Sequence, residues 1–88
     1  MEISVTVEYR NTKLKDAREK AGLSQGQLAA LTGVSTRVIQ NYEQGVRNLN
    51  GAKLLTLLQF CKALQCDLQD IISDPEALAL LDELYPRT

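Results

Sequence analysis

Residues 24–45, with the sequence SQGQLAALTGVSTRVIQNYEQG, contain two short helical patterns separated by a tight break. Ser24 and Gln27 form a capping box, which predicts a helix that begins directly after Ser24. Gly33 can end this helix, because glycine adopts the left-handed conformation at little cost, and Ser35 can cap a second helix. Helices this short are marginal alone in water, so the two must pack together at a steep angle.

Two short helices joined by a tight turn form the helix-turn-helix arrangement. The segment has a small residue where the helices cross, a glycine at the turn and apolar residues after it, namely Ala29, Gly33, Val34, Ile39 and Tyr42. With these residues, and with Glu43 near the end of the second helix, the chain resembles the Cro and lambda-repressor family (XRE type) of bacterial and phage regulators. The resemblance extends from about Thr12 to Ser73, since the helices predicted on either side also fit the family.

The predicted fold class is all-α, with a compact five-helix lambda-repressor-like helix-turn-helix domain over residues 11–73. A β-strand arm is expected over residues 1–10, where polar residues alternate with Ile3, Val5, Val7 and Tyr9. A single strand leaves its backbone unpaired, so it needs the same strand of a second subunit or another protein, unless the N-terminus is frayed. Residues 74–88 are expected to form a short extra C-terminal helix.

Caps and apolar spacing place the helices that flank the motif. Asn11 or Thr12 can cap a first helix that Gly22 closes. Asn50 can cap a fourth helix, whose wide apolar face comprises Leu54, Leu57, Leu58, Cys61 and Leu64, with Leu55 and Phe60 widening it. A face this wide predicts burial on two sides, against the motif and against something else.

The end of the chain contains two further helix signals. Asp67 and Asp70 begin a predicted fifth helix, whose Leu68, Ile71 and Ile72 are expected to cover the core. Residues 74–76, Asp-Pro-Glu, then combine a cap, a proline at the first helical position and an acid in the first turn. This sequence predicts the start of the extra C-terminal helix, which could fold back onto the domain or contribute to a dimer contact.

The net charge of −1 hides an uneven distribution along the chain. Residues 10–53 carry eight basic and three acidic side chains, whereas residues 1–9 have a net charge of −2 and residues 54–88 a net charge of −4. The positive charge is therefore concentrated in the segment that holds the motif, which favours contact with nucleic acid.

Several function classes have no support in the sequence. The chain has no histidine, and its two cysteines are too few for a zinc site of the usual ligand count, so no metal or cofactor is expected. Cys61 and Cys66 are interpreted as small buried apolar residues. No nucleophile–base pair or phosphate loop points to an enzyme. The apolar runs are too short to cross a membrane and no signal peptide is recognisable, so a cytoplasmic protein is expected.

The resemblance implies roles for particular side chains, because the second motif helix of this family enters the major groove of double-stranded DNA. The residues expected to read bases are Thr36, Arg37, Gln40 and Asn41. Arg37 can make a bidentate contact with guanine, and either amide can do so with adenine. The residues expected to contact the DNA backbone are Gln25, Ser35, Gln44, Arg47 and Asn48. Gln25 could instead brace the recognition helix.

The resemblance also implies a structural ion pair between Arg18 in the first helix and Glu43 in the recognition helix. The leading hypothesis is a sequence-specific transcriptional regulator, a repressor of phage or mobile-element type, which binds its operator as a homodimer. The alternative is an antitoxin-like or adaptor protein whose main role is to bind a protein partner through its acidic C-terminal half.

Overall fold

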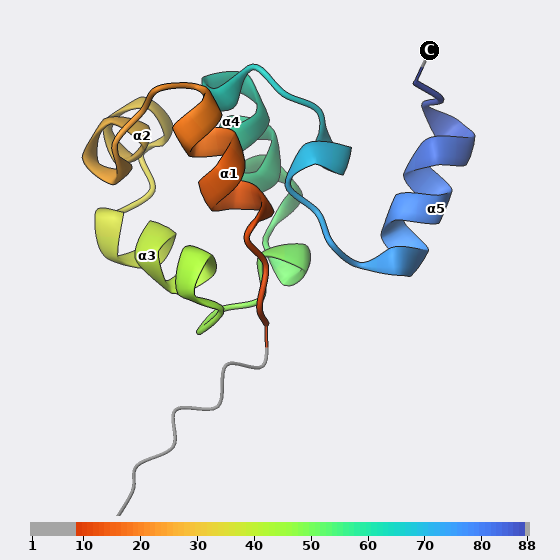
Figure 1. Ribbon diagram of the computed structural model, residues 1–88, viewed down its shortest axis with the longest axis horizontal. Coiled ribbons are helices and arrows are strands. Elements are labelled where there is room, and N and C mark those ends of the chain that lie inside the picture. The colour runs from red at the N-terminus through yellow and green to blue at the C-terminus, as the bar shows by residue number, and fades with distance from the viewer. Residues whose placement is uncertain (1–8, 88) are drawn as a thin grey trace, which may run out of the picture.

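Five α-helices and two 3₁₀ turns make up residues 9–87, the part of the chain that the computed structural model describes (Figure 1). In chain order, the elements are α1 (Lys13–Lys20), α2 (Gln25–Thr32), α3 (Thr36–Gln44), η1 (Leu49–Gly51), α4 (Leu54–Leu64), η2 (Leu68–Asp70) and α5 (Pro75–Leu84). The strand predicted over residues 1–10 lies almost entirely outside the described residues. Among these, no helix has the length and apolar character needed to cross a membrane.

The boundaries of α2 and α3 follow from the local capping residues that the sequence predicted. The Ser24 hydroxyl accepts a hydrogen bond from the backbone N–H of Gln27 at 3.0 Å, and the Gln27 side chain accepts one from the Ser24 N–H at 2.8 Å. Gly33 ends α2 with a φ of 75°, in the left-handed region. The Ser35 hydroxyl then caps α3 by accepting from the N–H of Val38 at 3.2 Å. The predicted capping box and turn are confirmed.

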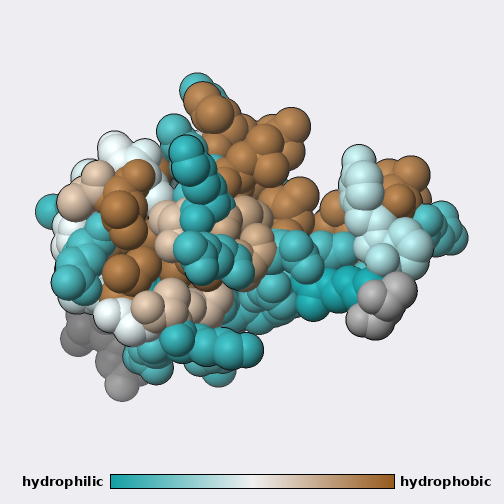
Figure 2. All heavy atoms as spheres, turned by 90° about the horizontal axis from the view of Figure 1, so that it is seen from above, coloured by the Kyte–Doolittle hydropathy of each residue, from teal (hydrophilic) through white to brown (hydrophobic). Residues whose placement is uncertain are grey.

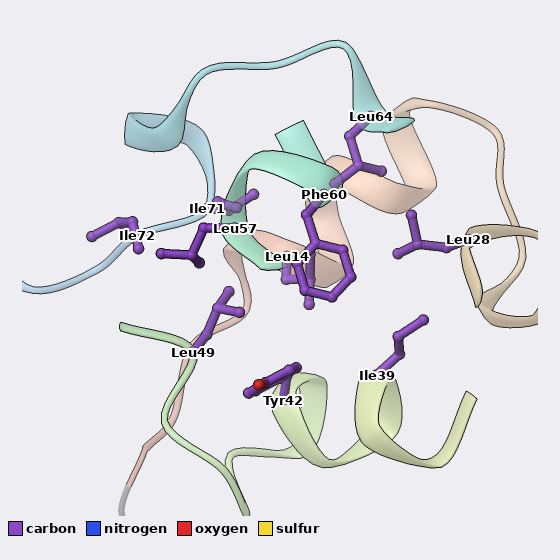
Figure 3. Close-up of a cluster of buried hydrophobic side chains, with 10 residues drawn as sticks. All are labelled: Leu14, Leu28, Ile39, Tyr42, Leu49, Leu57, Phe60, Leu64, Ile71 and Ile72. Carbon is purple, nitrogen blue, oxygen red and sulfur yellow. The ribbon is translucent and has the colours of Figure 1, made fainter. Parts of the chain in front are cut away.

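The core lies where α1, α2, α3 and α4 converge, and the last residues before α5 cover it (Figure 3). It consists of Leu14, Leu28, Ile39, Tyr42, Leu49, Leu57, Phe60, Leu64, Ile71 and Ile72. Ile39 and Tyr42 anchor α3 in this core, and the ring of Tyr42 meets the ring of Phe60 edge-on, with centroids 6.1 Å apart. The inner side of α3 is therefore fixed by apolar packing.

The exposed side of α4 differs from the prediction. Phe60 was expected only to widen the apolar face, but it is fully buried, whereas Leu54 and Leu58 are 64% and 47% exposed. Leu55 is 68% exposed. Because apolar residues occupy most of the helix circumference, spacing alone cannot decide which arc meets the core. No described element covers the second arc, so the second contact that the prediction required is not made by the described residues.

The predicted fifth helix is only the single 3₁₀ turn η2, after which Ile71 and Ile72 enter the core together. Adjacent side chains on an α-helix point in directions about 100° apart. The irregular backbone after η2 lets both isoleucines be buried side by side. Asn50 does not cap α4, because it lies in η1 and Lys53 is the residue at the N-cap.

Helix α5 begins as predicted, with Pro75 at its first position and the Asp74 carboxylate accepting from the Glu76 N–H at 3.2 Å. It packs against η2 and stands to one side of the group formed by α1 to α4 (Figure 1). None of its residues is fully buried. This helix is therefore attached to the domain by one side only.

The two cysteines meet at the C-terminal end of α4, where the N–H of Cys66 donates to the carbonyl of Cys61 at 3.1 Å. Both are half-buried free thiols. Burial raises the pKa of Cys66 to about 12 and also raises the pKa of Cys61, so both thiols remain protonated near neutral pH. They pack as small apolar residues.

Candidate nucleic-acid interface

Helix α3 separates its buried and its polar residues onto different sides. Ile39 and Tyr42 face the core. The four residues expected to read bases are Thr36, Arg37, Gln40 and Asn41. Their spacing of i, i+1, i+4 and i+5 places them on an arc of the helix about 140° wide that faces away from the core. Arg37 is exposed, and the other three are half-buried. The structure therefore brings all four to one face.

Arg18 of α1 and Glu43 of α3 form a bidentate ion pair beneath this face. Arg18 Nε donates to one carboxylate oxygen of Glu43 at 2.8 Å, and Nη2 donates to the other at 3.1 Å. Nη1 donates to the carbonyl of Leu23 at 2.8 Å. The two charged side chains are only 12% and 3% exposed. The hydrogen bond to Glu43 raises the pKa of Arg18, although burial acts in the opposite direction.

Gln25, at the start of α2, extends this ion pair back to the middle of α3. Its amide nitrogen donates to Glu43 Oε1 at 3.1 Å, and its amide oxygen accepts from Gln40 Nε2 at 3.2 Å. The resulting chain of contacts, Arg18–Glu43–Gln25–Gln40, is called the brace below. Because it joins three helices, it fixes the rotation of α3 as well as its position.

The brace changes the interpretation of two predicted DNA contacts. Gln25 was expected either to contact a phosphate or to brace the recognition helix, and its observed partners are those of a brace. Gln40 was expected to read a base, but its amide nitrogen already donates to Gln25. Sequence patterns do not reveal this second contact, because Gln25 and Gln40 lie in different helices and neither is part of a capping motif.

The other residues expected at the DNA backbone lie at the two ends of α3 and in the loop that follows. Ser35, Gln44, Arg47 and Asn48 are all exposed. The loop is held to the helix because the carbonyl of Asn41 accepts from the N–H groups of Val46 and Arg47, at 2.9 and 3.1 Å. Asn48 also caps η1 by accepting from the Asn50 N–H at 3.0 Å. These polar groups therefore extend from a fixed backbone.

The charges of the C-terminal part lie apart from α3. Helix α5 carries Glu76, Asp82 and Glu83 and stands on the opposite side of the domain from α2 and α3 (Figure 1). Lys13 belongs to the basic segment but serves the fold, because its ammonium donates to the carbonyls of Gln69, at 2.6 Å, and of Ile72. Arg37 lies on the polar face of α3, and Arg47 lies in the loop that directly follows this helix.

Comparison with known proteins identifies the family. A sequence profile described as helix-turn-helix matches residues 14–71. The chain is similar to the crystal structure of the restriction-modification controller protein C.AhdI from Aeromonas hydrophila, with 30% sequence identity and a TM-score of 0.59. This similarity covers 67% of the present chain and 85% of that protein. No curated protein matches the chain. The matched residues include α3 and the whole brace, and the chain belongs to the XRE-type helix-turn-helix family of DNA-binding transcription regulators.

Proposed function

We propose that this protein is a sequence-specific repressor that reads operator DNA with α3, the helix that the brace fixes in place. The observation that carries the proposal is the combination of an exposed Arg37 with an α3 whose far side is anchored in the core and whose polar side is tied to Gln25. A helix held in this way can enter the major groove without a cost for ordering its backbone or the Gln40 side chain.

Each residue of the polar face has a distinct role in this proposal. Arg37 makes the bidentate contact with guanine, and Asn41 reads an adenine. Gln40, held by Gln25, presents its remaining amide oxygen and second N–H to a base edge or a phosphate. Arg47 and Asn48, in the loop after α3, contact the phosphates and set the register of the helix in the groove.

A single domain of this size offers few base contacts, so the operator is proposed to contain two half-sites bound by a homodimer. Half-sites about one helical turn apart, roughly 34–36 Å between centres, face the same side of the duplex. Two copies double the contact area and impose two-fold symmetry on the site. Repression then follows from the dimer occupying DNA that the transcription machinery needs.

The similarity to a restriction-modification controller protein favours a more specific second candidate, control of restriction-modification genes. The two candidates share the same DNA-binding chemistry and differ only in the genes controlled. If the second is correct, the selected operator will occur upstream of restriction-modification genes in the genome that encodes this protein. Its absence there, together with its presence upstream of other genes, would leave the general repressor.

Selection of bound sequences from random double-stranded DNA tests the proposal. The wild-type protein is expected to enrich a palindromic site at low salt. Arg37→Ala is expected to relax the preference at one base pair in each half-site, by about 1–3 kcal/mol, because it removes a bidentate contact. The proposal fails if the wild-type protein enriches no sequence under these conditions.

Arg47→Ala is the matched control, because Arg47 is also an exposed arginine but lies in the loop after α3 and not on the helix itself. It is expected to weaken binding to all sequences alike and to lower the slope of log affinity against log salt by about one. If Arg47→Ala relaxes one base preference and Arg37→Ala does not, the assignment of the two arginines is reversed.

A further inference from the structure

Exposed large hydrophobic side chains are concentrated on α4 and α5. The described residues include nine exposed large hydrophobic side chains. Six of them lie on or directly beside these two helices, namely Leu54, Leu55, Leu58, Leu80, Leu84 and Tyr85. Their exposed fractions range from 47% to 68%. Isolated exposed leucines are ordinary, but clusters on neighbouring elements mark surfaces that bind a partner.

The two clusters lie on the same side of the molecule. In Figure 2, hydrophobic atoms gather along the upper edge of the view, over the middle of the molecule where α4 lies and again over α5 at the right. On α5, Leu78 and Leu81 are half-buried, and Leu80 and Leu84 continue their apolar arc into solvent. Within one chain the two clusters face outward side by side, so they cannot cover each other.

The charges of the two helices differ in sign. Helix α4 and its N-cap carry Lys53 and Lys62 and no acidic residue. Helix α5 carries Glu76, Asp82 and Glu83 and no basic residue. A contact of α4 with α4, or of α5 with α5, would bring like charges together, whereas a contact between α4 and α5 brings opposite charges together.

The lengths of the two helices also match. At 1.5 Å per residue, the 11 residues of α4 span about 16 Å and the 10 residues of α5 about 15 Å. The α4 and α5 surfaces lie on one face of the molecule. A two-fold axis that lies in the plane of this face and runs between the two surfaces brings a second copy onto the first. The α4 surface of each copy then meets the α5 surface of the other. Such a dimer closes, because both clusters of both copies are covered.

We propose that two copies of this chain form a two-fold dimer in which the exposed leucines of α4 in each copy pack against the apolar arc of α5 in the other. The occupant of the α4 surface is thus α5 of a second copy, flanked by contacts between lysines and carboxylates. This interface uses α5, which lies outside the residues matched by the family profile. This proposal rests on the proposed function in one respect: a protein that binds an operator with two half-sites needs a second copy.

Sedimentation equilibrium of the full chain without DNA tests the interface. Wild type is expected to dimerise, and Leu58→Glu on α4 and Leu84→Glu on α5 are each expected to weaken self-association at least about tenfold. Leu31→Glu is the matched control: Leu31 is 63% exposed on α2, and its substitution is expected to leave the dimer unchanged. Thermal unfolding of each variant verifies that the fold is retained. A wild type that stays monomeric overturns the interface, as does a Leu84→Glu variant that dimerises normally.

Charge reversal distinguishes the reciprocal contact from other symmetric pairings. Lys62→Glu alone, and Glu76→Lys combined with Glu83→Lys, are each expected to weaken the dimer, and all three substitutions together to restore it. If Lys62→Glu strengthens the dimer whatever the charge of α5, the contact is α4 with α4 and the proposal fails.

Binding to DNA separates a failure of the interface from a failure of the proposed function. Leu84→Glu is expected to bind a single half-site like wild type and to lose most of the added affinity for two half-sites. If wild type dimerises through α4 and α5 but binds no DNA sequence selectively, the interface stands and the repressor function fails. If wild type reads DNA but remains monomeric, the function stands and the interface fails.

Discussion

Different kinds of interaction stabilise the two halves of this domain. The half that contains α1, α2 and α3 is locked by a nearly buried ion pair and the amides attached to it, and its polar face has one defined orientation. The half that contains α4 and α5 exposes leucines, and α5 is attached on one side through neutral hydrogen bonds and a partly exposed ion pair. A base-reading surface needs a fixed geometry, whereas an apolar surface can be completed by a partner.

The strongest test of this contrast removes the charge of Glu43. In Glu43→Gln, the guanidinium of Arg18 keeps its charge but loses its carboxylate in a site where the side chain is only 12% exposed. The free energy of unfolding, measured by urea denaturation, is expected to fall by about 3–5 kcal/mol. Lys15→Gln, which removes a charge at an exposed position on α1, is the control and should change the free energy of unfolding by less than about 0.5 kcal/mol. A similarly small loss for Glu43→Gln would mean that the brace behaves as a surface pair.

A second test loosens the other half of the domain. The side chain of Asn50 joins η1 to the segment before α5: its oxygen accepts from the N–H groups of Ser73 and Asp74, at 2.8 and 3.2 Å, and its nitrogen donates to the Ser73 hydroxyl at 3.1 Å. Asn50→Ala is expected to destabilise the fold by about 1–3 kcal/mol, because these groups lose their partner. Amide hydrogen exchange should accelerate more in α5 than in α3.

Asn48→Ala provides the comparison for Asn50. Asn48 is exposed, and its carboxamide oxygen accepts one hydrogen bond, from the Asn50 N–H. Its loss is expected to cost less than the loss of Asn50 and to leave exchange in α5 unchanged. If Asn50→Ala accelerates exchange equally in α3 and α5, the two halves unfold as one unit and the contrast between them does not hold.

The sequence predicted the helix-turn-helix segment because its signals are local. The capping residues Ser24 and Ser35 and the glycine at position 33 each act within a few residues, so their effect on the backbone does not depend on the rest of the fold. The likeness to a known family supplied the partners Arg18 and Glu43, which composition and spacing alone do not connect.

The sequence could not predict features that depend on long-range packing. Apolar residues surround most of α4, so only the folded chain determines that Phe60 is buried and Leu54 is exposed. Asn50 is of a residue type that often caps helices, but its hydrogen-bond partners lie 23 and 24 residues further along the chain. The contact between Gln25 and Gln40 likewise exists only after α2 and α3 have packed together.

The smallest expected effect concerns Asp70, at the surface between η2 and the end of the chain. Its carboxylate accepts from the N–H of Asp67 at 2.9 Å and from Arg87 Nη1 at 3.1 Å, and these contacts lower its pKa, with the Asp67 N–H as the larger cause. In acid, the unfolded chain therefore takes up the proton before the folded chain does. The stability that Asp70 contributes is complete above its ordinary pKa and is lost as the pH falls through the lowered value.

Denaturation curves of wild type and Asp70→Asn between neutral pH and about pH 3 measure this contribution. The two proteins are expected to differ most near neutral pH and to converge as the pH falls below about 4, the ordinary pKa of an aspartate. A difference between wild type and Asp70→Asn that stays constant down to the lowest pH would mean that the carboxylate acts through its shape alone. The ion pair between Asp70 and Arg87 would then make no electrostatic contribution to stability. The attachment of α5 would depend on apolar packing and on the hydrogen bonds of Asn50.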